Sequence, residues 1–229
     1  MKIVALLLAT LLVWANANED DEHRNLKSGK GKRGGKSMKT ISIKFTNLAF
    51  QQPLSGFFVL THNKHAEPLF TLGAPASDAL ARLAEDGNPG PLVDMYTGMD
   101  GVGYAGTFTE GAPFFVGGSY VIEIPYSKKY PYVSVASMAI NTNDCFVAIN
   151  GMKLDSGDYI WGPGYDSGTE VNNELCSSIP GPACPADSGN EESGDGEGVV
   201  HVHRGFHGVG DLSEAGYDWR NPMILFEVM

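Results

Sequence analysis

The chain has 229 residues and carries 16 Lys and Arg against 27 Asp and Glu, a formal net charge of −11. This acidic balance, in a chain whose N-terminus is typical of exported proteins, makes nucleic acid an unexpected partner. Hydrophobic residues make up 42% of the chain, enough for a core, and its 29 glycines are typical of many turns between short strands.

The first 17 residues have the pattern of a secretory signal peptide. Lys2 precedes an apolar run that extends to Trp14, and the small residues Ala15 and Ala17 flank Asn16 in a small-x-small cleavage site. The apolar run is shorter than the roughly 20 residues that a membrane-spanning helix needs, and no later stretch reaches that length. We therefore predict cleavage after Ala17, secretion to the extracellular space and no membrane span.

Residues 18–39 form a tail that is first acidic and then basic. Four acids occupy 19–22, whereas residues 24–39 contain seven Lys and Arg and no acid. No hydrophobic periodicity accompanies these charges, so we expect the tail to be disordered. It is a candidate for binding a polyanion, such as an acidic polysaccharide, and the alternative is a solvated spacer.

The rest of the chain, residues 40–229, is predicted to be one domain built mainly from short strands. Alternating or apolar runs predict strands at 40–48, 57–62, 119–124, 132–140, 199–203 and 223–229, of which 132–140 is apolar enough to be central.

Two helices and one hairpin interrupt this pattern. Ser77 is a capping residue before apolar residues at helical spacing, which predicts a helix that ends near Gly87, and a second short helical piece is predicted at 91–96. Residues 145–149 and 152–154 flank Asn150-Gly151, a pattern typical of a hairpin. Together these elements predict an all-β fold, an antiparallel β-sandwich with one or two short helices.

The three cysteines of the chain are Cys145, Cys176 and Cys184. Export permits disulfides, and Cys176 and Cys184 enclose a Pro- and Gly-containing loop that can bring their sulfurs together. We predict this disulfide. Cys145, within an apolar run, is then left over and expected to be buried, the alternative being a bond between two chains.

Acidic loop residues suggest a cation site. Asp166 and Glu170 lie four residues apart around a glycine, and Asp144 stands at the start of another apolar run. Three carboxylates gathered from two loops at one end of a sandwich are suitable ligands for a hard cation such as Ca²⁺. Solvated surface acids are the alternative, because spacing alone is a weak signal.

Histidines form a second cluster, with His201 and His203 at i, i+2 on one face of a predicted strand and His207 nearby. This arrangement occurs in Zn²⁺ sites, so the three are a possible second metal site and the basis of an alternative function, a metal-dependent enzyme. A structural role in hydrogen bonding is the other interpretation. The chain has no nucleophile elbow, phosphate-binding loop or dinucleotide fingerprint, so we predict no catalytic residues.

A set of short blocks runs through the domain at 45–48, 53–55, 69–70, 73–77, 83–87, 141–144, 165–174, 201–205 and 218–222, with His62 between the second and third. These blocks resemble the spondin N-terminal domain family over roughly residues 40–229. They recur in order, and they are most similar to stand-alone exported members of the family.

The resemblance implies a C2-like β-sandwich that holds Ca²⁺. In the animal matrix members, F-spondin and mindin, three aspartates bind the ion, and the matching positions here are Asp144, Asp166 and Glu170. Glu170 departs from the aspartate of that pattern but still offers carboxylate oxygens. Those members act in cell adhesion, although a shared fold does not fix function.

The sequence thus predicts a secreted Ca²⁺-binding module for extracellular adhesion or for binding a matrix or surface, and not an enzyme. Its partner would be an extracellular protein or polysaccharide. A structural protein that assembles through the basic tail is a further hypothesis.

Overall fold

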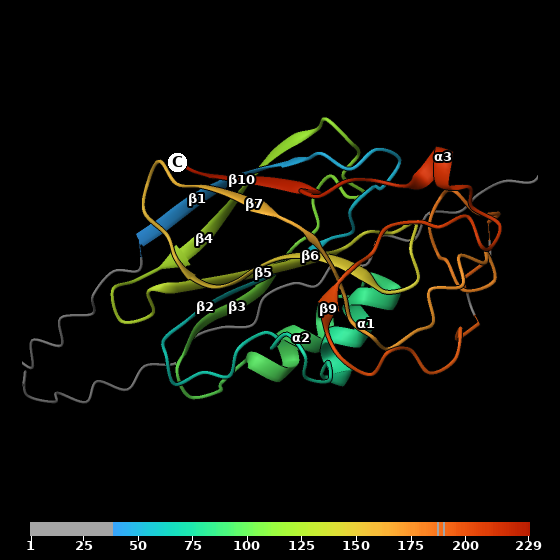
Figure 1. Ribbon diagram of the computed structural model, residues 1–229. Coiled ribbons are helices and arrows are strands. Elements are labelled where there is room, and N and C mark those ends of the chain that lie inside the picture. Colours follow the sequence, from blue (N-terminus) through green and yellow to red (C-terminus); the bar gives the residue numbers. More distant parts are fainter. Residues whose placement is uncertain (1–38, 187, 190) are drawn as a thin grey trace, which may run out of the picture. The chain divides into compact units, whose positions relative to one another are not determined.

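Two antiparallel sheets make up the fold (Figure 1). The structure is a computed structural model that describes residues 39–186, 188–189 and 191–229. The predicted signal peptide and the tail, except Lys39, lie outside the described residues. The elements are β1 (Lys39–Asn47), β2 (Phe57–His62), α1 (Asp78–Asp86), α2 (Gly90–Tyr96), β3 (Val102–Phe108), β4 (Ser119–Tyr126), β5 (Tyr132–Met138), β6 (Cys145–Lys153), β7 (Tyr159–Gly162), β8 (Gly164–Asp166), β9 (His201–Val202), α3 (Glu214–Tyr217) and β10 (Ile224–Val228).

The sheets have the orders β4-β1-β10-β7 and β3-β2-β5-β6-β8-β9. Every pair of neighbouring strands is antiparallel. The predicted all-β antiparallel sandwich is therefore confirmed, with three short helices among the described residues instead of one or two. β5 lies between β2 and β6, the central position that its apolar sequence predicts.

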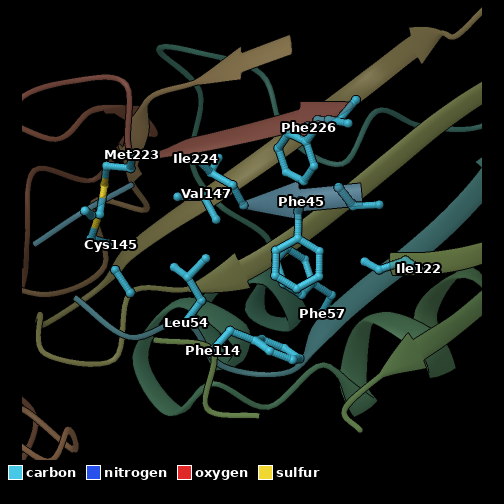
Figure 2. Close-up of a cluster of buried hydrophobic side chains, with 14 of the residues drawn as sticks. Phe45, Leu54, Phe57, Phe114, Ile122, Cys145, Val147, Met223, Ile224 and Phe226 are labelled. Atoms are coloured by element: carbon cyan, nitrogen blue, oxygen red, sulfur yellow. The ribbon is translucent and has the colours of Figure 1, made fainter. Parts of the chain in front are cut away.

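The main core fills the space between the two sheets. Alternate residues of strands such as β1, β2, β6 and β10 point into it, as the two-residue period of a strand requires, and Ile43 and Phe45 of β1 are buried there as predicted. Figure 2 shows Phe45 and Phe57 facing each other from opposite sheets, with ring centroids 4.5 Å apart. Burial of these large side chains is the main source of stability for the fold.

A second core lies on the outer face of the six-stranded sheet, where α1 and α2 cover it (Figure 1). Phe58 and Leu60 of β2 point to the helices, whereas their neighbours Phe57 and Val59 point to the main core, so β2 is buried on both faces. α1 begins as predicted, because the Ser77 hydroxyl accepts a hydrogen bond from the Leu80 amide at 3.2 Å.

One element of the sequence prediction is wrong. Residues 145–153 do not form a hairpin; they are a single strand, β6, and both of its halves pair with β5. Asn150 and Gly151 form a bulge at which the register shifts, and Gly151 has a φ of +62°. The Gly151 amide donates to the Ser134 hydroxyl at 2.8 Å. Asn-Gly supplies the left-handed backbone that a bulge and a hairpin turn both need, so the dipeptide alone does not distinguish them.

Two of the cysteines form the predicted Cys176–Cys184 disulfide. Cys145 is free and fully buried, beside Met223 in the main core (Figure 2). Because its sulfur has no exposed surface, it does not suit a bond between chains. Burial also raises the pKa of the Cys145 thiol well above its usual range. None of the helices in the described residues has the length and apolar character to cross a membrane.

Candidate metal centre

Strand pairing brings Asp144 and Asp166 to the same end of the six-stranded sheet. β6 and β8 are antiparallel, and Cys145 at the start of β6 is paired with Asp166 at the end of β8. Asp144 directly precedes β6, so the two carboxylates belong to adjacent strand ends. Both residues are fully buried. Their closeness follows from strand pairing between residues that are about twenty positions apart in the chain.

A tight loop after β8 wraps around one oxygen of Asp144. Asp144 Oδ2 accepts hydrogen bonds from the Ser167 hydroxyl at 2.9 Å, the Thr169 amide at 2.9 Å and the Glu170 amide at 3.2 Å. Gly168 permits this turn with a φ of +70°, and a Cβ there would collide with the backbone of Val199. The other oxygen, Asp144 Oδ1, is buried and has no hydrogen-bond partner.

All three carboxylic acids predicted to bind the cation are destabilised as anions. Burial, followed by the charge of Asp166, raises the pKa of Asp144 to about 6. Burial also raises the pKa of Asp166. The pKa of Glu170 rises to about 7, mainly through burial and then through the charges of Glu85 and Asp144. Within the described residues, no Lys or Arg forms a salt bridge with these acids.

The arrangement fits a hard cation at Asp144 and Asp166 better than at Glu170. A buried carboxylate oxygen without a donor is what a divalent cation compensates. Glu170, which is nearly buried, already accepts a hydrogen bond from the Ser193 amide at 3.1 Å through Oε1. The ligand atoms of the three acids do not all lie within 4.8 Å of one another in the described part of the chain. Glu170 must therefore turn its second oxygen inward, or leave the ion to the two aspartates and backbone oxygens.

Neighbouring amides and acids support this loop structure. Asn172 Nδ2 donates to Asp166 Oδ2 at 2.8 Å. Asn143 Oδ1 accepts from the Glu174 amide at 3.3 Å, and its Nδ2 donates to Asn173 Oδ1 at 3.1 Å. Glu174 uses both carboxylate oxygens to accept the backbone amides of His207 and Val209. These side chains fix the loops in place, so they are less free than the aspartates to bind an ion.

The three predicted histidine ligands have different environments. His203 is buried, and its Nδ1 accepts from the Gly205 amide at 3.0 Å. The proton is therefore on Nε2, which donates to Asn172 Oδ1 at 2.9 Å. With both nitrogens bonded, burial lowers the pKa of His203 to about 3. His207 is exposed, and its backbone amide donates a hydrogen bond to the Glu174 carboxylate.

His201 lies with Asp166 and Glu197, and the sequence pattern predicts no role for Glu197. Their ligand atoms all lie within 4.8 Å of one another, and among the described residues they are the one group of three or more metal-ligating side chains that meets this limit. β9 ends at Val202, so His203 lies outside the strand, but both histidines approach Asp166: their Nε2 atoms lie 3.7 and 3.8 Å from Oδ1 and Oδ2 of Asp166. Asp166 thus stands between two histidines.

No protein-family model matches the chain, and no curated protein matches it either. The spondin resemblance therefore stays a prediction carried by the motif residues themselves.

Proposed function

We propose that the protein is a secreted Ca²⁺-binding module of the spondin type that acts in extracellular adhesion or in binding a matrix or surface. The observation that supports the calcium site best is the buried pair Asp144 and Asp166, with Asp144 Oδ1 lacking any donor. Raised carboxylate pKa values beside a sheet end, without a Lys or Arg salt bridge in the described residues, are typical of sites that hold a cation.

Asp144, Asp166 and Glu170 would hold the ion, with backbone oxygens completing its shell. The bound ion would supply positive charge between the start of β6 and the loop that follows β8. Two hydrogen bonds within the chain hold Asp144 in place: the Ser167 hydroxyl and the Thr169 amide both donate to its Oδ2. Extracellular Ca²⁺ sites have dissociation constants of roughly 10⁻⁴ to 10⁻³ M.

The calcium site is tested by isothermal titration of Ca²⁺ into the full chain after removal of metals. Asp144→Asn keeps the shape of the side chain but removes its charge, so we expect Ca²⁺ binding to be lost. Asp155→Asn is the matched control, because Asp155 is an exposed acid in the turn before β7. Equal binding by wild type and Asp144→Asn would refute the site.

Secretion is supported by the signal-peptide pattern and is compatible with the Cys176–Cys184 disulfide. Expression of the full chain in a secreting host should release a protein into the medium that begins at Asn18. Retention inside the cell with Met1 intact would contradict this part of the proposal.

The surface-binding role is supported by charge. Residues 24–39 carry seven basic residues, whereas the chain from residue 40 onward holds 8 basic and 23 acidic residues. A basic segment attached to an acidic domain can bind a polyanion such as an acidic polysaccharide, and the segment alone would make the contact. We expect retention on a heparin column that weakens with salt and disappears when residues 18–39 are deleted. Unchanged retention after that deletion would exclude the tail as the contact.

A further inference from the structure

We propose that Asp166, Glu197 and His201 form a second metal site, for a divalent transition-metal ion of the Zn²⁺ type. This inference goes beyond the calcium site, because it uses a nitrogen ligand and two residues, Glu197 and His201, that the calcium site does not use. Zn²⁺ takes imidazole nitrogen together with carboxylate oxygen, whereas Ca²⁺ selects oxygen ligands.

The distances between the ligand atoms suit this ion. His201 Nε2 lies 3.7 Å from Asp166 Oδ1 and 3.6 Å from Glu197 Oε2. Around a tetrahedral Zn²⁺ with bonds of 2.0–2.1 Å, neighbouring ligand atoms are about 3.3 Å apart. The two distances to His201 Nε2 therefore need to shorten by only a few tenths of an ångström, and the ligand atoms of Asp166 and Glu197 lie within 4.8 Å of each other. Glu197 and His201 are side chains with partly exposed surface, so they have room to make that movement.

The hydrogen bonding of His201 leaves the metal-binding nitrogen free. His201 Nδ1 lies 3.0 Å from the Val202 carbonyl oxygen. A carbonyl only accepts, so Nδ1 carries the proton and the neutral ring has its lone pair on Nε2. This Nε2 atom is buried and has no hydrogen-bond partner. A histidine that donates one N–H to a carbonyl and points the other nitrogen at carboxylates has the orientation of a metal ligand.

An ion pair without a metal explains the geometry less well. If His201 were doubly protonated, its Nε2–H would approach a carboxylate oxygen to about 2.7–2.9 Å, the usual length of a charge-assisted hydrogen bond. Both oxygens instead lie beyond 3.5 Å from this nitrogen. The distances therefore suit an ion bound by the three ligand atoms better than a hydrogen-bonded ion pair.

Other side chains hold the carboxylates in position and leave one side open. Arg204 Nη2 donates to Glu197 Oε1 at 3.2 Å, which leaves Oε2 facing His201. The Gly168 amide donates to Asp166 Oδ1 at 2.8 Å. The side chain of Asp166 is 1% exposed, whereas those of His201 and Glu197 are 27% and 32% exposed. The ion would thus have three protein ligands, with water in the remaining position on the solvent side.

The test is isothermal titration of Zn²⁺ into the metal-free full chain. We expect one strong site in the wild type, and affinity at least about 100-fold lower in His201→Gln and Glu197→Gln, since each removes or neutralises a direct ligand. His207→Gln is the matched control, because His207 is an exposed histidine outside the group, and its affinity should stay unchanged. Circular dichroism melts in chelator check that each variant is folded.

Two variants separate this proposal from the calcium site. His201→Gln should lose Zn²⁺ and keep Ca²⁺, whereas Asp144→Asn should lose Ca²⁺ and keep Zn²⁺ within a few-fold. Asp166→Asn belongs to both sites and is therefore not used to decide. The proposal is overturned if His201→Gln binds Zn²⁺ as the wild type does, if His207→Gln abolishes the strong site, or if the wild type has no strong site.

Discussion

The two halves of the six-stranded sheet bury polar groups in opposite ways. In β2, β3 and β5, all within the described part of the chain, every buried side-chain polar atom has a hydrogen-bond partner. His62 is the clearest case, with one ring nitrogen 3.1 Å from the Asn63 carbonyl oxygen and the other 3.1 Å from the Ser134 hydroxyl. In the half with β6, β8 and β9, Asp144 Oδ1, Asn150 Oδ1 and His201 Nε2 are buried without partners, and the first and last of these atoms belong to the candidate ion sites.

Under the proposed function, this difference separates a half whose buried polar groups are satisfied within the protein from a half that binds ions. Apolar packing and internal hydrogen bonds stabilise the first half, so metals should not affect it. The second half buries carboxylates whose charge favours ionic partners from solution. The predictions below test this contrast, from the largest expected effect to the smallest.

Phe57→Ala should have the largest effect, because it removes a fully buried ring from β2 that packs on Phe45, Phe114 and Phe226. We expect a loss of about 3–5 kcal/mol in the free energy of unfolding. Urea unfolding in Ca²⁺ and in chelator should give the same loss. A loss that depends on Ca²⁺ would show that the two halves are not independent.

Without metal, the contribution of Asp144 to the free energy of unfolding should fall as pH rises from about 4 to about 6, whereas that of His203, whose pKa is lowered to about 3 in the folded state, should rise over this range. The pKa of Asp144 is raised in the folded state from 3.8 to about 6, so this group binds more protons in the folded protein than in the unfolded chain in this window. The pKa shift corresponds to a contribution of about 3 kcal/mol to the free energy of unfolding, and this contribution is fully lost above the folded pKa. Denaturant unfolding should show that the free energy of unfolding of the wild type falls relative to that of Asp144→Asn as pH rises. Parallel pH profiles would contradict it.

Removal of the Cys176–Cys184 disulfide tests the covalent support of the second half. The bond joins residues eight apart in the chain, and closing so short a loop stabilises by about 2.5 kcal/mol through the entropy of the unfolded chain. Cys176→Ser with Cys184→Ser should lower the free energy of unfolding by that amount while Ca²⁺ still binds. Loss of Ca²⁺ binding would show that the disulfide also shapes the ion site.

Much of the fold was predictable because the relevant signals are local. Alternation predicts β1 and β2, the Ser77 cap predicts α1, and an apolar run predicts the central position of β5. β3 was missed because Gly103 and Gly106 interrupt its apolar pattern. The bulge in β6 was mistaken for a hairpin turn because Asn-Gly suits both.

The candidate site was predictable only in part, because it is assembled by long-range contacts. The closeness of Asp144 and Asp166 follows from the pairing of β6 with β8, which the sequence alone does not show. Glu197 lies in a glycine-rich acidic segment with no local pattern. Contacts such as the Gly198 amide to the Gly168 carbonyl, at 2.8 Å, fold that segment back over the site.

The most direct test of the contrast is thermal unfolding of the full chain in Ca²⁺ and in EGTA, for wild type and Asp144→Asn. At tenfold excess over its dissociation constant, Ca²⁺ should stabilise the wild type by about 1.4 kcal/mol. That should raise its Tm by roughly 3–6 °C, whereas Asp144→Asn should show no change. A wild-type Tm that is the same in Ca²⁺ and EGTA, or an equal rise in both proteins, would contradict the account.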